Sequence, residues 1–166
     1  MDIYFGDMNK SKWFAIIISA FVLSTACIAY AQTSFDPPTL VVTKPAQPIS
    51  GIAPAGALHV PFTTVDLTAR GSDIIVDDIT VERIGAADDE AFEDILLVSS
   101  DGEVIDEGSL DDEHIVHFTE PIYITRNTAL RLTVAANMAE SLEEFDGHIP
   151  SFTIIGISAS GYIKVK

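Results

Sequence analysis

From Leu58 onward, apolar and polar residues alternate with a period of two, which is typical of β-strands that bury one face. The clearest segment is 130–136, in which Leu130, Leu132 and Val134 alternate with Arg131 and Thr133. Further strands are expected at residues 65–70, 79–82, 94–99, 103–106, 114–119, 152–159 and 162–165. No strand pattern is followed by a long helical pattern, so the sequence favours an all-β fold over a parallel α/β sheet.

Turn signals separate these segments. Asp101-Gly102 is the strongest, because glycine tolerates the positive φ that tight hairpins require, and it predicts a hairpin between the flanking strands. Only residues 87–93 and 138–144 could hold a helical turn. Short strands at this spacing predict an immunoglobulin-like antiparallel β-sandwich of about seven to nine strands, preceded by an N-terminal signal helix.

Residues 10–32 have the organisation of an export signal, with two lysines, an apolar run from Trp13 to Ile28 and a motif of small residues. The expected cleavage motif consists of Ala29, Ala31 and Gln32. The predicted organisation is a signal peptide (1–31), an extended proline-rich arm with one strand (32–57) and a β-sandwich domain (58–166).

Two alternatives to cleavage remain open. Residues 13–31 are just long enough to stay as an uncleaved membrane anchor. Cys27 could carry a lipid, although Ser24 stands where a lipobox usually has leucine. With cleavage, the expected location is extracellular or at the cell surface, with no membrane contact, and the mature chain keeps no cysteine for a disulfide.

The arm contains a short β-branched segment that predicts a strand made of Thr39, Leu40, Val41, Val42 and Thr43. Its prolines disfavour helix. The strand could pair within its own domain, or it could add to an open sheet edge of a neighbouring copy and serve as an assembly strand.

The formal net charge is −16, from 25 acidic residues against 9 lysines and arginines. Such a chain repels phosphate backbones, so nucleic acid is excluded as a partner, and a bare anionic lipid surface is excluded for the same reason.

The acidic clusters are the candidate metal site. The cluster proposed for a structural Ca²⁺ consists of Asp88, Asp89, Glu90, Glu93 and Asp94. Calcium takes six to eight oxygen ligands from flexible carboxylate loops. No segment matches the spaced acidic loop of an EF-hand, and the alternative is a solubilising acidic surface with no cofactor.

The sequence offers no catalytic residue. His114 and His117 are three positions apart, which places them on opposite faces of a strand. Gly156 to Ser160 lacks the second glycine of a nucleophile elbow. We therefore expect a protein that is not an enzyme.

Residues 60–105, 118–138 and 152–161 together resemble a module repeated in surface-layer-like and other extracellular proteins of uncultured bacteria. The resemblance implies an immunoglobulin-like fold and a surface role, with no chemistry to carry over. That family usually has Pro-Ala-Gly before its Leu-Thr-Val strand, whereas this chain has residues 125–128 there, and Asn127 is expected to adopt the left-handed conformation in place of glycine.

The functional expectation is an exported, non-enzymatic structural subunit that assembles with its own copies into a cell-surface layer or extracellular filament. The alternative is a secreted or anchored binding or adhesion module on the same fold.

Overall fold

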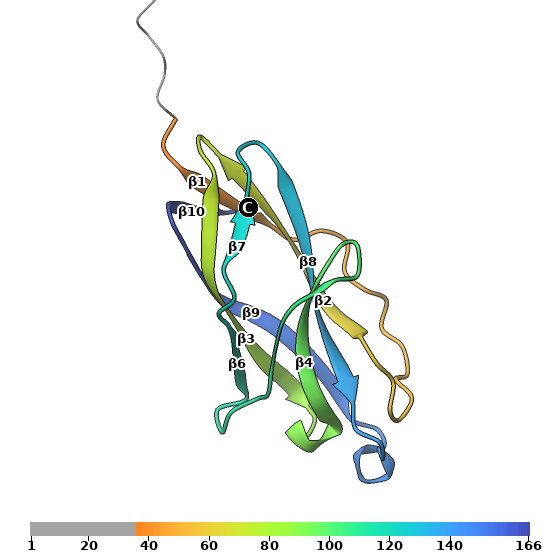
Figure 1. Ribbon diagram of the computed structural model, residues 1–166. Coiled ribbons are helices and arrows are strands. Elements are labelled where there is room, and N and C mark those ends of the chain that lie inside the picture. The colour runs from red at the N-terminus through yellow and green to blue at the C-terminus, as the bar shows by residue number, and fades with distance from the viewer. Residues whose placement is uncertain (1–35) are drawn as a thin grey trace, which may run out of the picture. The chain divides into compact units, whose positions relative to one another are not determined.

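A computed structural model describes residues 36–166, which form an all-β unit (Figure 1). The strands are β1 (Thr39–Thr43), β2 (Val60–Arg70), β3 (Ile74–Ala86), β4 (Phe92–Ser99), β5 (Val104–Gly108), β6 (Ile115–Phe118), β7 (Ile122–Ile124), β8 (Ala129–Met138), β9 (Ile149–Ala159) and β10 (Tyr162–Val165). The 3-10 turns η1 (Asp89–Ala91) and η2 (Glu143–Phe145) precede β4 and β9. The predicted signal peptide and its cleavage motif at Ala29, Ala31 and Gln32 lie outside the described residues.

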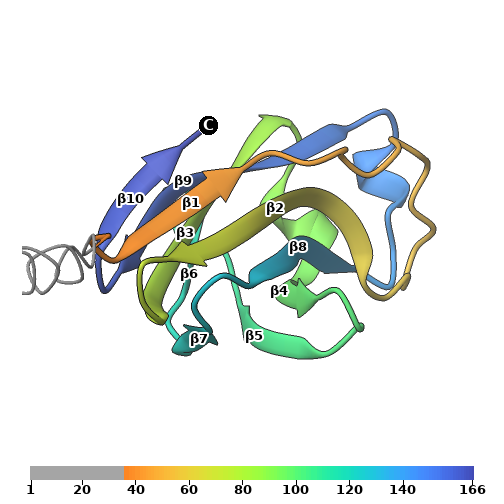
Figure 2. The same ribbon diagram turned by 90° about the horizontal axis from the view of Figure 1, so that it is seen from above.

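The strands form two sheets. The six-stranded sheet has the order β10-β1-β2-β8-β4-β5, and in the four-stranded sheet β3 pairs with β9 on one side and with β6 and β7 on the other. All pairs are antiparallel except β1 with β10, which run parallel. Figure 2 shows β9, β10 and β1 along one flank of the sandwich and β5 and β7 along the opposite flank.

The core lies between the sheets and is built from the apolar positions of the alternating pattern, since side chains i and i+2 of a strand share a face. Among its largest fully buried side chains are Leu40, Leu67, Ile74, Ile79, Leu97, Phe118 and Leu132. At one end, the rings of Phe62, Phe92 and Phe152 pack edge to face, with centroids 5.0–5.8 Å apart.

The all-β prediction is confirmed, and so is the hairpin at Asp101-Gly102, where β4 and β5 pair antiparallel and Gly102 has φ 88°. The expected all-antiparallel arrangement of about seven to nine strands is wrong in detail, because residues 36–166 form ten strands and β1 pairs with β10 in parallel. Of the two segments expected to hold a helical turn, 87–93 contains the 3-10 turn η1, whereas 138–144 overlaps the 3-10 turn η2 only at residues 143 and 144. Asn127 adopts the left-handed conformation, with φ 62°. The predicted strand at 114–119 starts at Ile115, because His114 has φ 64° and belongs to the preceding turn.

The predicted arm is part of the sandwich. β1 pairs with β2 on one edge and with β10 on the other, and Leu40 in its centre is completely buried. Of the two pairings left open for residues 39–43, the structure therefore shows the one within the domain, with both edges of the strand occupied. In residues 36–166, no helix has the length and apolar character needed to cross a membrane.

Candidate interaction surface

β10 is an edge strand of the six-stranded sheet with unusually exposed apolar side chains. Within residues 36–166 it pairs only with β1. Tyr162 is 71% exposed and Val165 is 77% exposed, and Ile163 between them is also exposed. The pairing with β1 contains no bulge, and neither proline nor an acidic residue interrupts β10. The outer side of β10 has no partner strand in residues 36–166, so it is an open edge, although its length of four residues and Lys164 are two features that limit pairing at sheet edges.

The sharp turn before β10 is set by Gly161, which has φ 146°. A Cβ at this position would lie 3.0 Å from both the Pro38 carbonyl oxygen and Ile74 Cδ1. Glycine is therefore required for β10 to lie against β1.

β9 is the neighbouring edge, in the four-stranded sheet. Its register with β3 shifts between the pairs Thr80–Gly156 and Val81–Ile154, so Ile155 is the extra residue of a bulge. The Ile155 side chain is 49% exposed. A bulge protects this edge from continuous pairing and also turns an apolar side chain outward.

A groove of about 660 Å³ separates these two edges. Val42, Phe62 and Val65 line it from the six-stranded sheet, and Phe152 and Ile154 line it from β9. Lys44 and Lys166 also line the groove, together with Ile163 and Val165 of β10, and none of its lining residues is acidic. The groove therefore has a mixed apolar and uncharged polar lining with two lysines, on a strongly acidic protein.

Gln47 fixes the chain that leaves β1 beside β2. Its Nε2 donates to the carbonyl oxygens of Pro45 and Thr64, both at 2.9 Å, and its Oε1 accepts from Thr63 Oγ1 and Thr64 N, also at 2.9 Å. The side chain continues the ladder where two prolines prevent regular pairing. The wall of the groove is held by this residue, which the sequence analysis did not single out.

The acidic loop predicted to bind Ca²⁺ is stabilised by protein donors. Asp89 forms a salt bridge with Arg83, and its other oxygen lies 2.6 Å from Nδ1 of His114. Asp88 accepts from the backbone N–H of Glu90 at the start of η1, and Asp94 lies 3.4 Å from Nδ2 of Asn137.

Four of the five predicted ligands, Asp89, Glu90, Glu93 and Asp94, border a small hollow beside Leu110. No group of three or more potential ligating side chains in residues 36–166 is arranged for a metal ion. The calcium site stays a prediction.

Arg83 is the buried charge of this region, 6% exposed, and it comes from the centre of β3. Besides Asp89, its Nη1 donates to the Ala87 carbonyl oxygen at 2.8 Å, and its Nη2 lies 2.9 Å from Nδ1 of His114. These contacts link the η1 loop and the turn before β6 to β3. The role that the contacts of Arg83 support is therefore structural.

His117 lies near two groups that could form a catalytic relay. Its Nδ1 is 3.1 Å from Asp78 Oδ2 and 3.4 Å from Thr80 Oγ1, and Thr80 Oγ1 donates to Asp78 Oδ1 at 2.7 Å. A nucleophile, base and acid in relay need opposite nitrogens of the imidazole. Because both contacts use the same nitrogen, this arrangement stabilises strand pairing and does not activate Thr80. His114 and His117 contact different carboxylates and do not form a metal pair.

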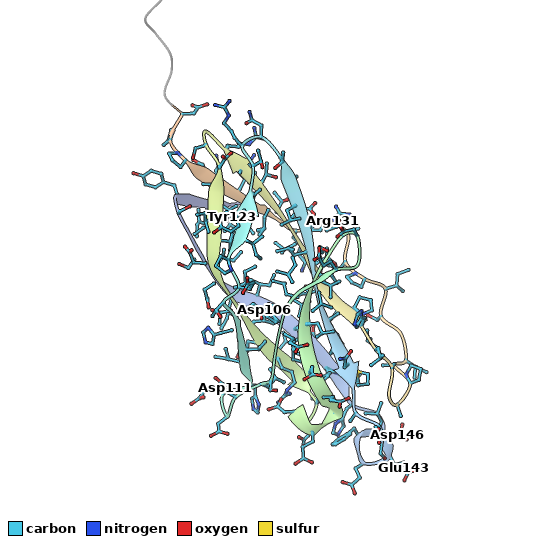
Figure 3. All side chains as sticks on the ribbon, in the orientation of Figure 1. Asp106, Asp111, Tyr123, Arg131, Glu143 and Asp146 are labelled. Atoms are coloured by element: carbon cyan, nitrogen blue, oxygen red, sulfur yellow. The ribbon has the colours of Figure 1, made fainter. Side chains whose placement is uncertain are left out.

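An exposed ion pair joins β2 to β8. Arg131 donates to both oxygens of Asp66, at 2.7 and 2.8 Å, from directly opposite positions in the ladder. This hydrogen bonding, together with the charge of Arg131, holds the pKa of Asp66 below its usual value. Figure 3 labels Arg131 on the strand.

Comparison with protein-family models finds no match for this chain, and comparison with curated proteins finds none either.

Proposed function

We propose that this chain is an exported, non-enzymatic structural subunit with an immunoglobulin-like β-sandwich, and that it assembles with its own copies in a cell-surface layer or an extracellular filament. One observation carries the proposal: β10 is a sheet edge without a partner strand in residues 36–166, and its apolar side chains Tyr162, Ile163 and Val165 are exposed. Exposed edges with apolar side chains are templates for pairing with another chain. Alternating strands in two facing sheets support the immunoglobulin-like class, and the resemblance to repeated surface-layer modules supports the location.

Export is supported by the lysines, apolar run and Ala-x-Ala motif of residues 10–31. Mass spectrometry of the protein isolated from its cells tests this part directly. A mature N-terminus at Gln32 is expected, and an intact N-terminus would favour the anchored alternative.

The test of assembly is light scattering of the segment from Gln32 to Lys166, which retains both sheets and the whole core, over a range of concentrations. Growth of the mean molar mass with concentration is expected. A monomer of constant mass at every concentration would refute self-assembly.

The groove favours a binding or adhesion module as the second candidate, because its volume of about 660 Å³ falls within the range of small-ligand sites. Gln47 lines this groove, but its amide is already fully hydrogen-bonded to backbone and to Thr63, so it offers a ligand no free hydrogen-bonding group. If the wild-type protein stays monomeric and binds a small ligand, and if Phe62→Ala abolishes that binding, the binding module would be favoured over the structural subunit.

A further inference from the structure

Charge is segregated along this chain and, through the fold, between two flanks. Residues 37–65 and 149–166 contain no Asp or Glu and carry all three lysines of the described chain, Lys44, Lys164 and Lys166. Because these two segments form β1, β9, β10 and the groove, they lie together. We call the surface formed by β9, β10 and residues 44–50 the lysine flank.

The opposite flank has the opposite charge. Residues 101–120 contain eight acidic residues and no lysine or arginine. They form β5, β6 and the adjoining turns, and Figure 3 marks Asp106 and Asp111 in this part of the chain. Asp106 accepts from the N–H groups of Thr119 and Glu120, which ties β5 to the segment after β6. We call this surface the acidic flank.

The two flanks end the same sheet. β10 and β5 are the first and last strands of the six-stranded sheet, and β5 presents Val104, Glu107 and the preceding Glu103 at its surface. β10 is parallel to β1, and the antiparallel pairs from β1 through β2, β8 and β4 to β5 bring β5 into that same direction. If a second copy is shifted sideways in the plane of the sheet, without rotation, its β5 lies beside β10 of the first copy. The two strands then run parallel, as β1 and β10 do within one copy.

Symmetric pairing is disfavoured by charge. A twofold contact between two lysine flanks would bring Lys164 and Lys166 against their own copies, and a contact between two acidic flanks would oppose eight carboxylates to eight. Of these three contacts, the one between unlike flanks joins opposite charges while it covers exposed side chains of β10.

We propose that copies of this chain join head to tail, with the lysine flank of one copy receiving the acidic flank of the next along β10 and β5. The proposal rests on the self-assembly proposed above and specifies its interface. Such a contact is heterologous and leaves one free flank of each kind at the two ends, so it propagates into an open filament or row. Apolar side chains of β10 supply the buried area, and the charges select the partner flank.

The test is a charge swap on exposed side chains in the segment from Gln32 to Lys166. Variant K164E/K166E makes the lysine flank acidic, and variant E103K/E107K changes the charge of residues 103–108, which contain β5, from −3 to +1. Each alone is expected to need a concentration at least about tenfold higher for assembly. Mixed in equal amounts, the two variants restore opposite charges at both contacts, so an alternating assembly is expected. Light scattering and electron microscopy measure assembly of each variant alone and of the mixture.

The matched control is E140K/E144K, which makes the same charge change as E103K/E107K at exposed positions outside both flanks and should assemble as the wild type does. Circular dichroism verifies that each variant is folded. Wild-type assembly that K164E/K166E leaves unchanged would overturn the head-to-tail interface while self-assembly stands. Wild-type protein that stays monomeric would refute both proposals.

A covalent readout is independent of charge. The mature segment has no cysteine, so Lys164→Cys combined with Glu107→Cys should give a ladder of oxidised multimers, whereas either single variant can give only dimers. A double variant that forms no ladder under conditions where the wild type assembles would contradict the contact between β10 and β5.

Discussion

At the scale of single residues, Arg83 is the polar side chain whose loss should lower stability the most. Replacement by methionine removes the guanidinium from Asp89, which keeps only its contact with His114, and removes the donor to the Ala87 carbonyl oxygen, so we expect the free energy of unfolding to fall by about 2–4 kcal/mol. Urea unfolding measures the change. The control is Arg131→Met, which removes an exposed ion pair and should have a clearly smaller effect. Equal losses in the two variants would show that burial of Arg83 is not the cause.

The clearest effect of removing Arg131 should be a change in the pKa of Asp66, because the exposed ion pair contributes little to the free energy of unfolding. Its hydrogen bonds lower that pKa, so Asp66 contributes stability that is present above its unfolded pKa and is lost as the pH falls through the folded value. In Arg131→Met, we expect the Asp66 pKa to rise toward its ordinary value, as measured by carboxyl ¹³C NMR titration. The side-chain signals of Asp146, which is distant in the sequence from both residues and exposed, serve as the reference. An unchanged Asp66 titration would contradict the assigned cause.

At the scale of elements, β1 is required for folding. It lies between β2 and β10, and Leu40 at its centre is fully buried. Leu40→Ala should lower the free energy of unfolding by about 2–5 kcal/mol, because it removes core contacts and leaves a cavity. Ile52→Ala, at a fully exposed position of the following segment, should be near neutral.

Removal of residues 32–46 should therefore unfold the domain, with loss of the dispersed amide signals in NMR. A truncated protein that kept its native spectrum would restore the separate, removable arm that the sequence predicted.

The strands differ in how far local sequence could specify them. The hairpin of β4 and β5 is encoded by Asp101-Gly102 between two alternating segments, and the left-handed Asn127 by its short polar side chain, so both were predictable. The parallel pairing of β1 with β10 joins residues more than 120 positions apart and has no local signal. Gln47 was missed for the same reason, since its partners Thr63 and Thr64 become neighbours only after folding.

The alternation within single strands therefore could not show that β10 is the edge of the sheet. One signal was present in the sequence: residues 37–65 and 149–166 lack acidic residues in a chain of net charge −16. Segments that share such an exception to the overall composition are candidates for one surface, even when their pairing is unknown.

At the scale of the whole molecule, the carboxylates should respond to divalent cations as a diffuse charge. In the loop predicted to bind Ca²⁺, Asp89 is held by Arg83 and His114, and Asp88 caps η1. We expect Ca²⁺ and Mg²⁺ at equal ionic strength to change the melting temperature equally, within about 1 °C, because both act by screening. A real site would distinguish the ions, since calcium accepts more oxygen ligands in a more flexible geometry. Calorimetry with each ion and with chelator measures this, and Asp94→Asn with Glu93→Gln is the matched variant. A rise specific to Ca²⁺ that this variant abolishes would confirm the predicted calcium site.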